Sequence, residues 1–394
     1  MQIGLLGKAN VGKSTFFSAA TETAVQTGNF PFTTIEPNVG VAHVRAPCAC
    51  GPLGVSHETP ECRGGTRLIP VRLIDVAGLV PGAHEGKGLG NKFLDAARQA
   101  DALIHVIDAA GSTDLQGQPV KPGTHDPAED ARFVVEEFDA WFGDILRREW
   151  QKLSKEIEQK RSGLAAAIAR RFSGLGIGEA DVSAALQSTG LHAKGAADWG
   201  DAEIGELART MREASKPMLV AANKADLVEG DVPAEIAGQR AIPCSSESEL
   251  LLGRAAASGA ISYSPGEASF EVSGGATPQQ RAALETVSGI LGRLGGTGVQ
   301  RALDEAVFGV LGMIVAYPVE DETKMCDKDG RVLPRALLLP RGSTAMDLAR
   351  AVHAEIAEGF LHGIDCKTGR RVGADHELSD GDVIKIVSTK ARGG

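Results

Sequence analysis

The chain has 394 residues, of which 43% are hydrophobic and 23% charged, and its formal net charge is −10. This composition is typical of a soluble globular protein with two or three domains. The acidic balance argues against a basic surface over the whole chain, so we expect no DNA binding and RNA binding only at a local patch. No secretory signal, membrane-length apolar run or disulfide framework is visible among the residues and the six cysteines. We therefore expect a monomeric cytoplasmic protein that does not associate with membranes.

Residues 7–14 read GKANVGKS and follow a short apolar run. This is the pattern G-x-x-x-x-G-K-[ST] between a candidate strand and a candidate helix, the setting of a phosphate-binding loop. Glycines permit the backbone angles with which N–H groups face a phosphate, Lys13 reaches the outer phosphates, and Ser14 offers its hydroxyl to Mg²⁺. The residues predicted to contact nucleotide here are Gly7, Asn10, Val11, Gly12, Lys13, Ser14 and Thr15.

Two further segments are predicted to meet the γ-phosphate. Residues 29–38 form a loop with two prolines, in which Thr34, or as second choice Thr33, can join the Mg²⁺ shell. An apolar strand ending at Asp75 carries the pattern D-x-x-G, so Asp75 can hold Mg²⁺ through water and Gly78 can offer its N–H to the γ-phosphate. The predicted catalytic residues are Lys13, Thr34 and Gly78, and the predicted Mg²⁺ residues are Ser14, Thr34 and Asp75.

An N-K-x-D pattern at residues 223–226 predicts the base specificity. It follows an apolar run, which puts Asn223, Lys224 and Asp226 at a strand end. There the Asp226 carboxylate can accept hydrogen bonds from the N1–H and 2-amino groups of guanine, both of which adenine lacks. Ser245 and Ser246 end the next apolar run, and their backbone N–H groups are candidate donors to the guanine oxygen. The pattern therefore predicts GTP and GDP as ligands.

Two features leave alternatives open. Cys48, Cys50, His57 and Cys62 have the spacing C-x-C-x₆-H-x₄-C in a Gly/Pro-rich loop, which fits a structural Zn²⁺ site. The alternative is a set of free thiols in a reducing cell. His105, in the apolar strand expected at 102–108, is either a proton relay or, as we favour, an ordinary core residue.

The spacing of these motifs predicts the domain organisation. Between Gly78 and Asn223 lie 144 residues, more than two strand–helix units need, and the surplus has helical periodicity with a candidate cap at Asp201. The last 75 or so residues have a strand–strand–helix–strand pattern, with a helix expected over 344–360. We predict an α/β P-loop NTPase domain, a helical insertion and a C-terminal α+β module, at residues 1–125 with 216–312, 126–215 and 313–394.

Four segments together resemble a known family. GKANVGKS at 7–14, FPFTTIEPN at 30–38, DVAGLVPGA at 75–83 and GKGLGN at 86–91 are similar to the Obg family of translation-factor-class GTPases, and most similar to its YchF-like branch. The C-terminal module resembles the TGS domain of that branch, a β-grasp fold. The resemblance covers nearly the whole chain and implies a Mg²⁺-dependent GTPase that contacts the ribosome or ribosomal RNA in translation or stress response.

Departures from the family pattern refine this resemblance. Residues 223–226 keep an intact box, which is degraded in the Obg-like ATPases, so the chain resembles the GTP-using relatives. The cysteine insertion is similar to archaeal members. Leu79 stands where Ras-like GTPases carry a catalytic glutamine, and in potassium-stimulated relatives an asparagine placed like Asn10 helps to hold K⁺. Two alternatives remain open: an Obg-like ATPase, and a nucleotide-stabilised RNA-binding or assembly protein in which hydrolysis is incidental.

Overall fold

The computed structural model describes residues 1–21, 38–57, 59–76, 98–160, 163–273 and 276–390. It divides into two compact units: residues 1–42 with 72–306, and residues 43–71 with 307–394. The division falls within strands β2 (Asn38–Pro47) and β4 (Thr66–Asp75). The sequence-based boundaries assign residues 43–71 to the first domain, whereas their contacts group them with the C-terminal residues.

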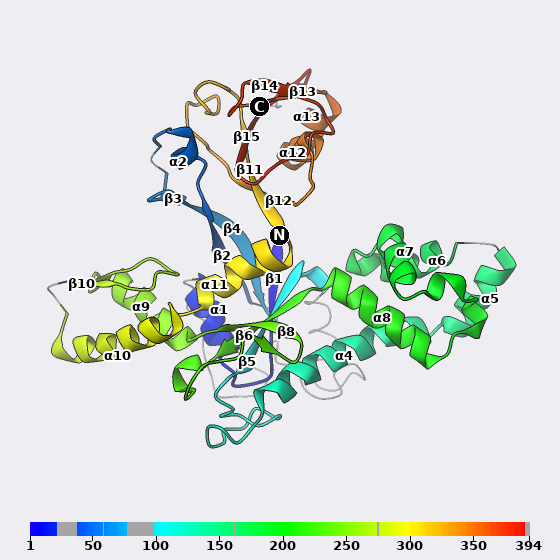
Figure 1. Ribbon diagram of the computed structural model, residues 1–394, viewed down its shortest axis with the longest axis horizontal. Helices are drawn as coiled ribbons and strands as arrows, with labels where there is room; N and C mark the ends of the chain where they lie inside the picture. The colour runs from blue at the N-terminus through cyan, green and yellow to red at the C-terminus, as the bar shows by residue number, and fades with distance from the viewer. Residues whose placement is uncertain (22–37, 58, 77–97, 161–162, 274–275, 391–394) are drawn as a thin grey trace. The chain divides into compact units, whose positions relative to one another are not determined.

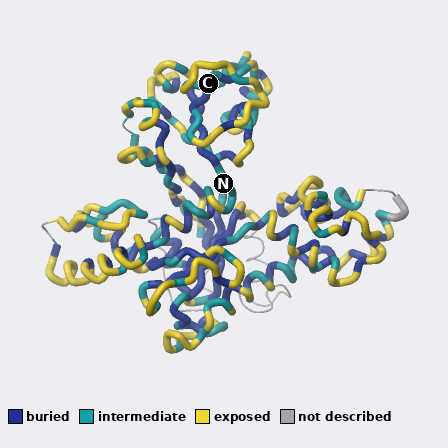
Figure 2. Tube along the Cα trace, viewed as in Figure 1, coloured by how far each residue is buried: buried dark blue, intermediate teal, exposed yellow. Residues whose placement is uncertain are grey.

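The main sheet, whose inner strands β1, β5, β6 and β8 all lie in the first unit, has the strand order β2-β4-β1-β5-β6-β8-β7, and β3 pairs with β4 beside it. Its inner strands are parallel, and β5 is buried along its whole length, as expected for a sheet covered on both faces (Figures 1 and 2). The strands not yet given are β1 (Gln2–Leu6), β3 (Cys62–Arg63), β5 (Ala102–Asp108), β6 (Met218–Asn223), β7 (Glu235–Ile236) and β8 (Gln239–Pro243). The carboxyl ends of parallel strands share one edge of the sheet, so the motifs that follow β1, β4, β5 and β6 converge there.

Helices pack around this sheet in the first unit. Helix α1 (Lys13–Thr21) contacts α9 (Ser246–Ala257) and α11 (Val299–Asp304). Helix α10 (Pro278–Leu294) ends at Gly295 in the left-handed conformation and shares an apolar cluster with α9. Helix α11 is followed directly by a π-helical segment, Glu305–Val310. The short pair β9 (Ile261–Ser262) and β10 (Glu271–Val272) lies between α9 and α10.

The segment from 127 to 215 is helical, and α4 and α8 run side by side along it (Figure 1). Its apolar cluster includes Phe138 and Phe142 and a stacked pair, Trp150 and Trp199, whose ring centroids are 4.8 Å apart. Gly200 caps α8, with the Glu203 carboxylate accepting its N–H, so the expected cap at Asp201 is wrong by one residue. The helices are α4 (Pro127–Arg147), α5 (Trp150–Lys160), α6 (Leu164–Phe172), α7 (Glu179–Ser188) and α8 (Asp201–Ser215).

The C-terminal part of the second unit is a five-stranded sheet in the order β12-β11-β15-β13-β14. The helix expected over 344–360 is interrupted, because His353 has extended backbone and its ring accepts the N–H of Glu355 to begin a second helix. Among the described residues, no helix is both long and apolar enough to cross a membrane. The elements are β11 (Met313–Val319), β12 (Leu337–Pro340), α12 (Ala345–Val352), α13 (Ala354–Glu358), β13 (Phe360–Asp365), β14 (Arg370–Val372) and β15 (Asp382–Ser388).

Candidate functional site

The backbone conformation of residues 7–14 explains why glycine stands at positions 7 and 12. Gly7 and Gly12 have φ of 147° and 91°, and Asn10 lies in the left-handed region at 62°. A Cβ atom on Gly7 would lie 2.4 Å from the carbonyl oxygen of Val106, and one on Gly12 would lie 2.3 Å from the Asn223 amide nitrogen. Only glycine fits these two positions, so the loop keeps the open, N–H-presenting shape that a phosphate requires.

The structure brings three predicted phosphate and Mg²⁺ residues together. Lys13, at the start of α1, forms an ion pair with Asp75 at the end of β4, and the Ser14 hydroxyl donates to the other carboxylate oxygen of Asp75 at 3.2 Å. Asp75 is buried, with 1% of its surface exposed. A hydroxyl, a carboxylate and an ammonium group in one cluster are the donor types that a Mg²⁺–phosphate pair needs, so these residues fit that ligand. Thr33, Thr34, Gly78 and Leu79 lie outside the described residues.

Asn223 connects two parts of the predicted nucleotide site. Its amide donates to the carbonyl of Val11 at 2.8 Å, and its Oδ1 accepts the N–H and the hydroxyl of Ser246 at 3.0 and 2.8 Å. All three residues are buried. The phosphate loop, the end of β6 and the start of α9 are therefore held in one arrangement by hydrogen bonds within the protein.

The two charged residues of the N-K-x-D box differ in their surroundings. Lys224, at φ 58°, donates to the Asp108 carboxylate at 2.9 Å and to the Ser112 hydroxyl at 3.1 Å. Burial alone would raise the pKa of Asp108, but the hydrogen bonds from Lys224 and Ser112 outweigh it and hold this pKa below its ordinary value. Asp226 is half-buried, and its carboxylate has no hydrogen-bond or ion-pair partner among the described residues. It is thus the member of the box that is available to a ligand.

Of four other residues predicted to contact the nucleotide, three donate hydrogen bonds to groups within the protein. The N–H of Ser245 donates to Thr297 and that of Ser246 to Asn223, so neither is available as the expected donor to a guanine oxygen. The Asn10 amide donates to the carbonyl of Gly117 at 2.9 Å, which orients this side chain toward the loop after β5. Thr15 lies half-buried in the first turn of α1.

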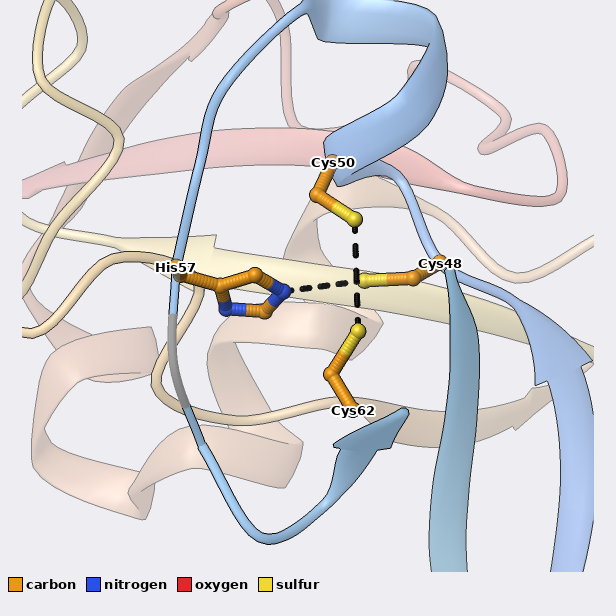
Figure 3. Close-up of side chains that lie close together, drawn as sticks. All are labelled: Cys48, Cys50, His57 and Cys62. Atoms are coloured by element: carbon orange, nitrogen blue, oxygen red, sulfur yellow. Dashed lines mark hydrogen bonds between the residues drawn. The ribbon is translucent and has the colours of Figure 1, made fainter. Parts of the chain in front are cut away.

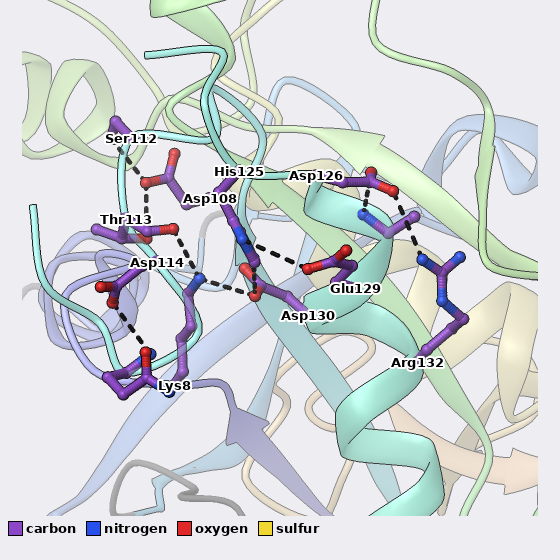
Figure 4. A network of polar contacts seen from close by, with 12 residues as sticks. Lys8, Asp108, Ser112, Thr113, Asp114, His125, Asp126, Glu129, Asp130 and Arg132 are labelled. Atoms are coloured by element: carbon purple, nitrogen blue, oxygen red, sulfur yellow. Dashed lines mark hydrogen bonds and ion pairs between the residues drawn. The ribbon is translucent and has the colours of Figure 1, made fainter. Parts of the chain in front are cut away.

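Sequence reasoning missed a buried network behind the phosphate loop (Figure 4). The Lys8 ammonium donates to the Asp130 carboxylate at 2.7 Å and to the carbonyl of Thr113 at 2.9 Å, and His125 contacts the same carboxylate oxygen at 2.7 Å. Lys8 and Asp130 are 3% and 2% exposed. Burial raises the pKa of Asp130, with Lys8 and His125 opposing it. Lys8 occupies an unrestricted position of the motif and Asp130 lies 122 residues away, so no sequence signal joins them.

His105 is an interior residue. It pairs in register with Leu6 on β1 and Val220 on β6, is 1% exposed, and its Nδ1 has no hydrogen-bond partner among the described residues. Burial, and then the charge of Lys8, lower its pKa to about 3. The imidazole is therefore neutral at pH 7, in keeping with a core residue rather than a relay.

The four predicted zinc ligands lie together in the second unit. The donor atoms of Cys48, Cys50, His57 and Cys62 are all within 4.8 Å of one another, and their side chains point toward a common centre (Figure 3). None of these cysteines is in a disulfide. Cys48 directly follows β2, Cys50 begins the short helix α2 (Cys50–Leu53), His57 lies in the following loop and Cys62 begins β3.

Comparisons with known proteins agree with this fold and site. Three family models match: "50S ribosome-binding GTPase" at 2–135, "Obg-like GTPase YGR210-like, G4 motif-containing domain" at 221–321, and "TGS domain" at 325–388. The GTP-binding protein MJ1332 of Methanocaldococcus jannaschii is 46% identical over 98% of each chain. The crystal structure of a GTP-binding protein from Pyrococcus horikoshii superposes with a TM-score of 0.79 at 38% identity, covering 99% of this chain and 100% of that one. The ribosome-binding ATPase YchF of Haemophilus ducreyi is 38% identical over 39% of this chain and 40% of its own.

The fold and the site define a P-loop GTP-binding protein with a C-terminal TGS domain. Within that class, the chain belongs to the Obg/YchF-like family of GTP-binding proteins. The resemblance and the fold class predicted from the sequence are thereby confirmed.

Proposed function

We propose that the protein binds GTP together with Mg²⁺ and hydrolyses it slowly, as a ribosome-associated regulator in the cytoplasm. The observation that carries this proposal is the carboxylate of Asp226, which has no partner among the described residues. It lies in the short helical turn just after β6, whose last residue, Asn223, bonds to the phosphate loop. A carboxylate there can accept from both N1–H and the 2-amino group of guanine, and adenine would leave it unpaired.

The residues of the loop supply the chemistry for in-line attack of water on the γ-phosphate. Lys13 brings a positive charge to the outer phosphates, and backbone N–H groups of the loop and of Gly78 stabilise the charge that develops in the transition state. Ser14, Thr34 and Asp75 would hold Mg²⁺, which when bound neutralises charge on the phosphate oxygens. Leu79 cannot orient the attacking water as a glutamine does, so we expect slow turnover.

Potassium is proposed as the activating cation. Leu79 removes one catalytic side chain, and Asn10 lies in the phosphate loop. Its amide nitrogen donates to Gly117, so its side-chain oxygen is the atom that would hold a monovalent cation. GTP turnover should therefore be faster in K⁺ than in Na⁺ at equal ionic strength. Equal rates in the two salts would contradict this part of the proposal without affecting GTP binding.

Guanine specificity is tested by competition of GTP and ATP for a fluorescent guanine nucleotide. We expect GTP to compete far better, and Asp226→Asn to weaken GTP binding by at least about 100-fold, because two charge-assisted hydrogen bonds are lost. The same variant should gain affinity for xanthosine triphosphate, whose 2-oxo group accepts from the new amide. Asp231→Asn, an exposed change in the next loop, is the matched control. Equal affinity of the native protein for GTP and ATP would favour an Obg-like ATPase, the activity named for the YchF relatives.

Association with ribosomes is supported by the description of the family model at 2–135 and by the names of the YchF relatives. The TGS domain is the proposed RNA or ribosome contact. Co-sedimentation with ribosomal particles should be stronger with GTP than with GDP. If Lys13→Ala still binds ribosomes and complements a deletion strain, hydrolysis is incidental and the protein is a nucleotide-stabilised RNA-binding or assembly factor.

A further inference from the structure

Two distances among the four Cys/His side chains match the edges of a tetrahedral metal site, and all four donor atoms lie within 4.8 Å of one another. Cys48 Sγ lies 3.5 Å from His57 Nε2, and Cys50 Sγ lies 3.9 Å from Cys62 Sγ. A tetrahedron with Zn–S of about 2.3 Å and Zn–N of about 2.0 Å has S···S edges of about 3.8 Å and S···N edges of about 3.5 Å. A disulfide would instead bring two sulfur atoms to about 2.05 Å. We infer that Cys48, Cys50, His57 and Cys62 hold one structural Zn²⁺ that fastens the 43–71 insertion to the C-terminal module.

The ligand set indicates a structural rather than a catalytic ion. Three thiolates and one imidazole complete the four-coordinate shell that Zn²⁺ prefers, which leaves no position for water or substrate. Cys48 is buried, and Cys50, His57 and Cys62 are half-buried. The four ligands would therefore shield the ion from solvent. Soft thiolate ligands also favour Zn²⁺ over Mg²⁺ or Ca²⁺.

A second contact fixes the imidazole in the form that a metal needs. His57 Nδ1 lies 3.2 Å from the carbonyl oxygen of Val332. Because a carbonyl can only accept, Nδ1 carries the proton, and Nε2 of the neutral ring has its lone pair free on the side facing Cys48. This backbone carbonyl is the outer-shell partner that ligating histidines regularly have. The same contact joins the ligand to the C-terminal module, since Val332 precedes β12.

A second residue of the segment 43–71 also bonds to the C-terminal module, next to Val332. The Arg67 guanidinium, on β4 opposite Cys62, donates to the carbonyls of Leu333 and Pro334 at 3.1 and 3.3 Å. Leu333 is fully buried and has a positive φ of 45°, so this stretch is held in a conformation that an isolated peptide would avoid. His57 and Arg67 together therefore bond to the carbonyls of three consecutive residues, 332–334.

Little regular structure supports the ligands themselves. Helix α2 has four residues and β3 has two, and positive-φ glycines form the turns at Gly54, Gly64 and Gly65. So short a hairpin has marginal stability alone, whereas binding of Zn²⁺ to such a site supplies folding free energy directly. The ion would therefore stabilise the loop that carries His57, and with it the hydrogen bond between His57 and the Val332 carbonyl.

Metal content of the full-length protein tests the site. After growth with added zinc and gel filtration, we expect about one Zn²⁺ per chain by mass spectrometry, and less than about a tenth of that in Cys48→Ser and Cys62→Ser. Cys366→Ser is the matched control, because Cys366 lies in the same unit but outside the cluster. Metal-free native protein, full zinc in Cys48→Ser, or a Cys50–Cys62 disulfide under reducing conditions would each overturn the site.

Two measurements do not depend on the folding of a variant. Co²⁺ exchanged into the native protein should give the visible bands and the thiolate charge-transfer band of tetrahedral sulfur ligation, and an octahedral spectrum would contradict the site. Removal of zinc by a chelator should speed amide exchange at Val332 and Leu333 at least about tenfold, with recovery on adding zinc back. If zinc leaves and exchange at these residues is unchanged, the proposed fastening is wrong. GTP affinity serves as the separate readout of the nucleotide site.

Discussion

The phosphate loop and the Cys/His hairpin are proposed to bind different ligands, and the contacts that hold them in shape also differ. Around the loop, Asn223 bonds to Val11 and Ser246, and Lys8 bonds to Asp130, so protein groups fix the backbone. In the hairpin, four donor atoms converge on a point with very little regular structure behind them. The comparison teaches that protein groups alone hold the phosphate loop in shape, whereas the hairpin would depend on the proposed ion. Changes behind the loop should therefore act on stability and leave zinc content unaltered.

The largest expected effect follows from removing Asp130. Asp130→Ala leaves the Lys8 ammonium buried with only a carbonyl partner, which should lower the free energy of unfolding by about 3–5 kcal/mol. All three tryptophans lie at 141, 150 and 199, so tryptophan fluorescence in urea follows the first unit alone. Glu136→Ala, an exposed change on the same helix, is the control and should cost less than about 0.5 kcal/mol.

A second variant shows whether the charge or the packing matters here. Lys8→Met combined with Asp130→Leu removes both charges and should recover much of the loss, as replacement of buried ion pairs by apolar residues often does. A cost below about 1 kcal/mol for Asp130→Ala alone would mean that the network contributes little. Loss of zinc in any of these variants would break the comparison between the two regions.

The two regions also differ in how far the sequence predicts them. Local motifs predict the loop and the strands that lead into it, and they assign roles to Lys13 and Asp75, because spacing along the chain sets the local geometry. The Cys/His spacing likewise predicts a cluster. The sequence cannot reveal that Lys8 meets Asp130 or that His57 meets Val332, since these pairs are 122 and 275 residues apart and depend on packing. The single helix expected over 344–360 is wrong because His353 has extended backbone and separates two helices. The apolar periodicity continues across this break, so the sequence pattern does not reveal it.

An intermediate effect is expected from breaking the tie between β6 and the loop. Asn223→Ala removes three hydrogen bonds and leaves the Val11 carbonyl and the Ser246 N–H buried without partners, at a cost of about 2–3 kcal/mol in the same urea experiment. Ser246→Ala removes only one of these bonds and should cost about 1 kcal/mol. GTP affinity should fall more in Asn223→Ala than in Ser246→Ala, because only the former frees the loop.

A double-mutant cycle between these positions measures the tie itself. If the two changes were additive to within about 0.3 kcal/mol, Asn223 would not act through Ser246 and the loop would be held by other contacts. We expect a coupling of about 1 kcal/mol, since the residues share a buried hydrogen bond. Zinc content and amide exchange at residues 332–334 should be those of the native protein throughout.

The smallest expected effect is acid sensitivity from His105. Its pKa is about 3 in the folded protein, against about 6.5 in the unfolded chain, so below pH 6.5 the unfolded state binds more protons and stability falls as the pH falls. Between pH 7 and pH 5.5 this group alone should lower the free energy of unfolding by about 1 kcal/mol.

Comparison of variants isolates this contribution from all other titrating groups. His105→Leu should be less sensitive to pH than the native protein by that amount over this interval, followed by tryptophan fluorescence. His192→Leu, an exposed position in the same unit, should keep the native pH dependence. Identical pH profiles for His105→Leu and the native protein would show that the imidazole becomes charged inside the sheet. In that case Asp130 would have to neutralise the nearby charge of Lys8, and water would have to reach the imidazole, so the sheet around His105 would be less tightly packed than its burial indicates.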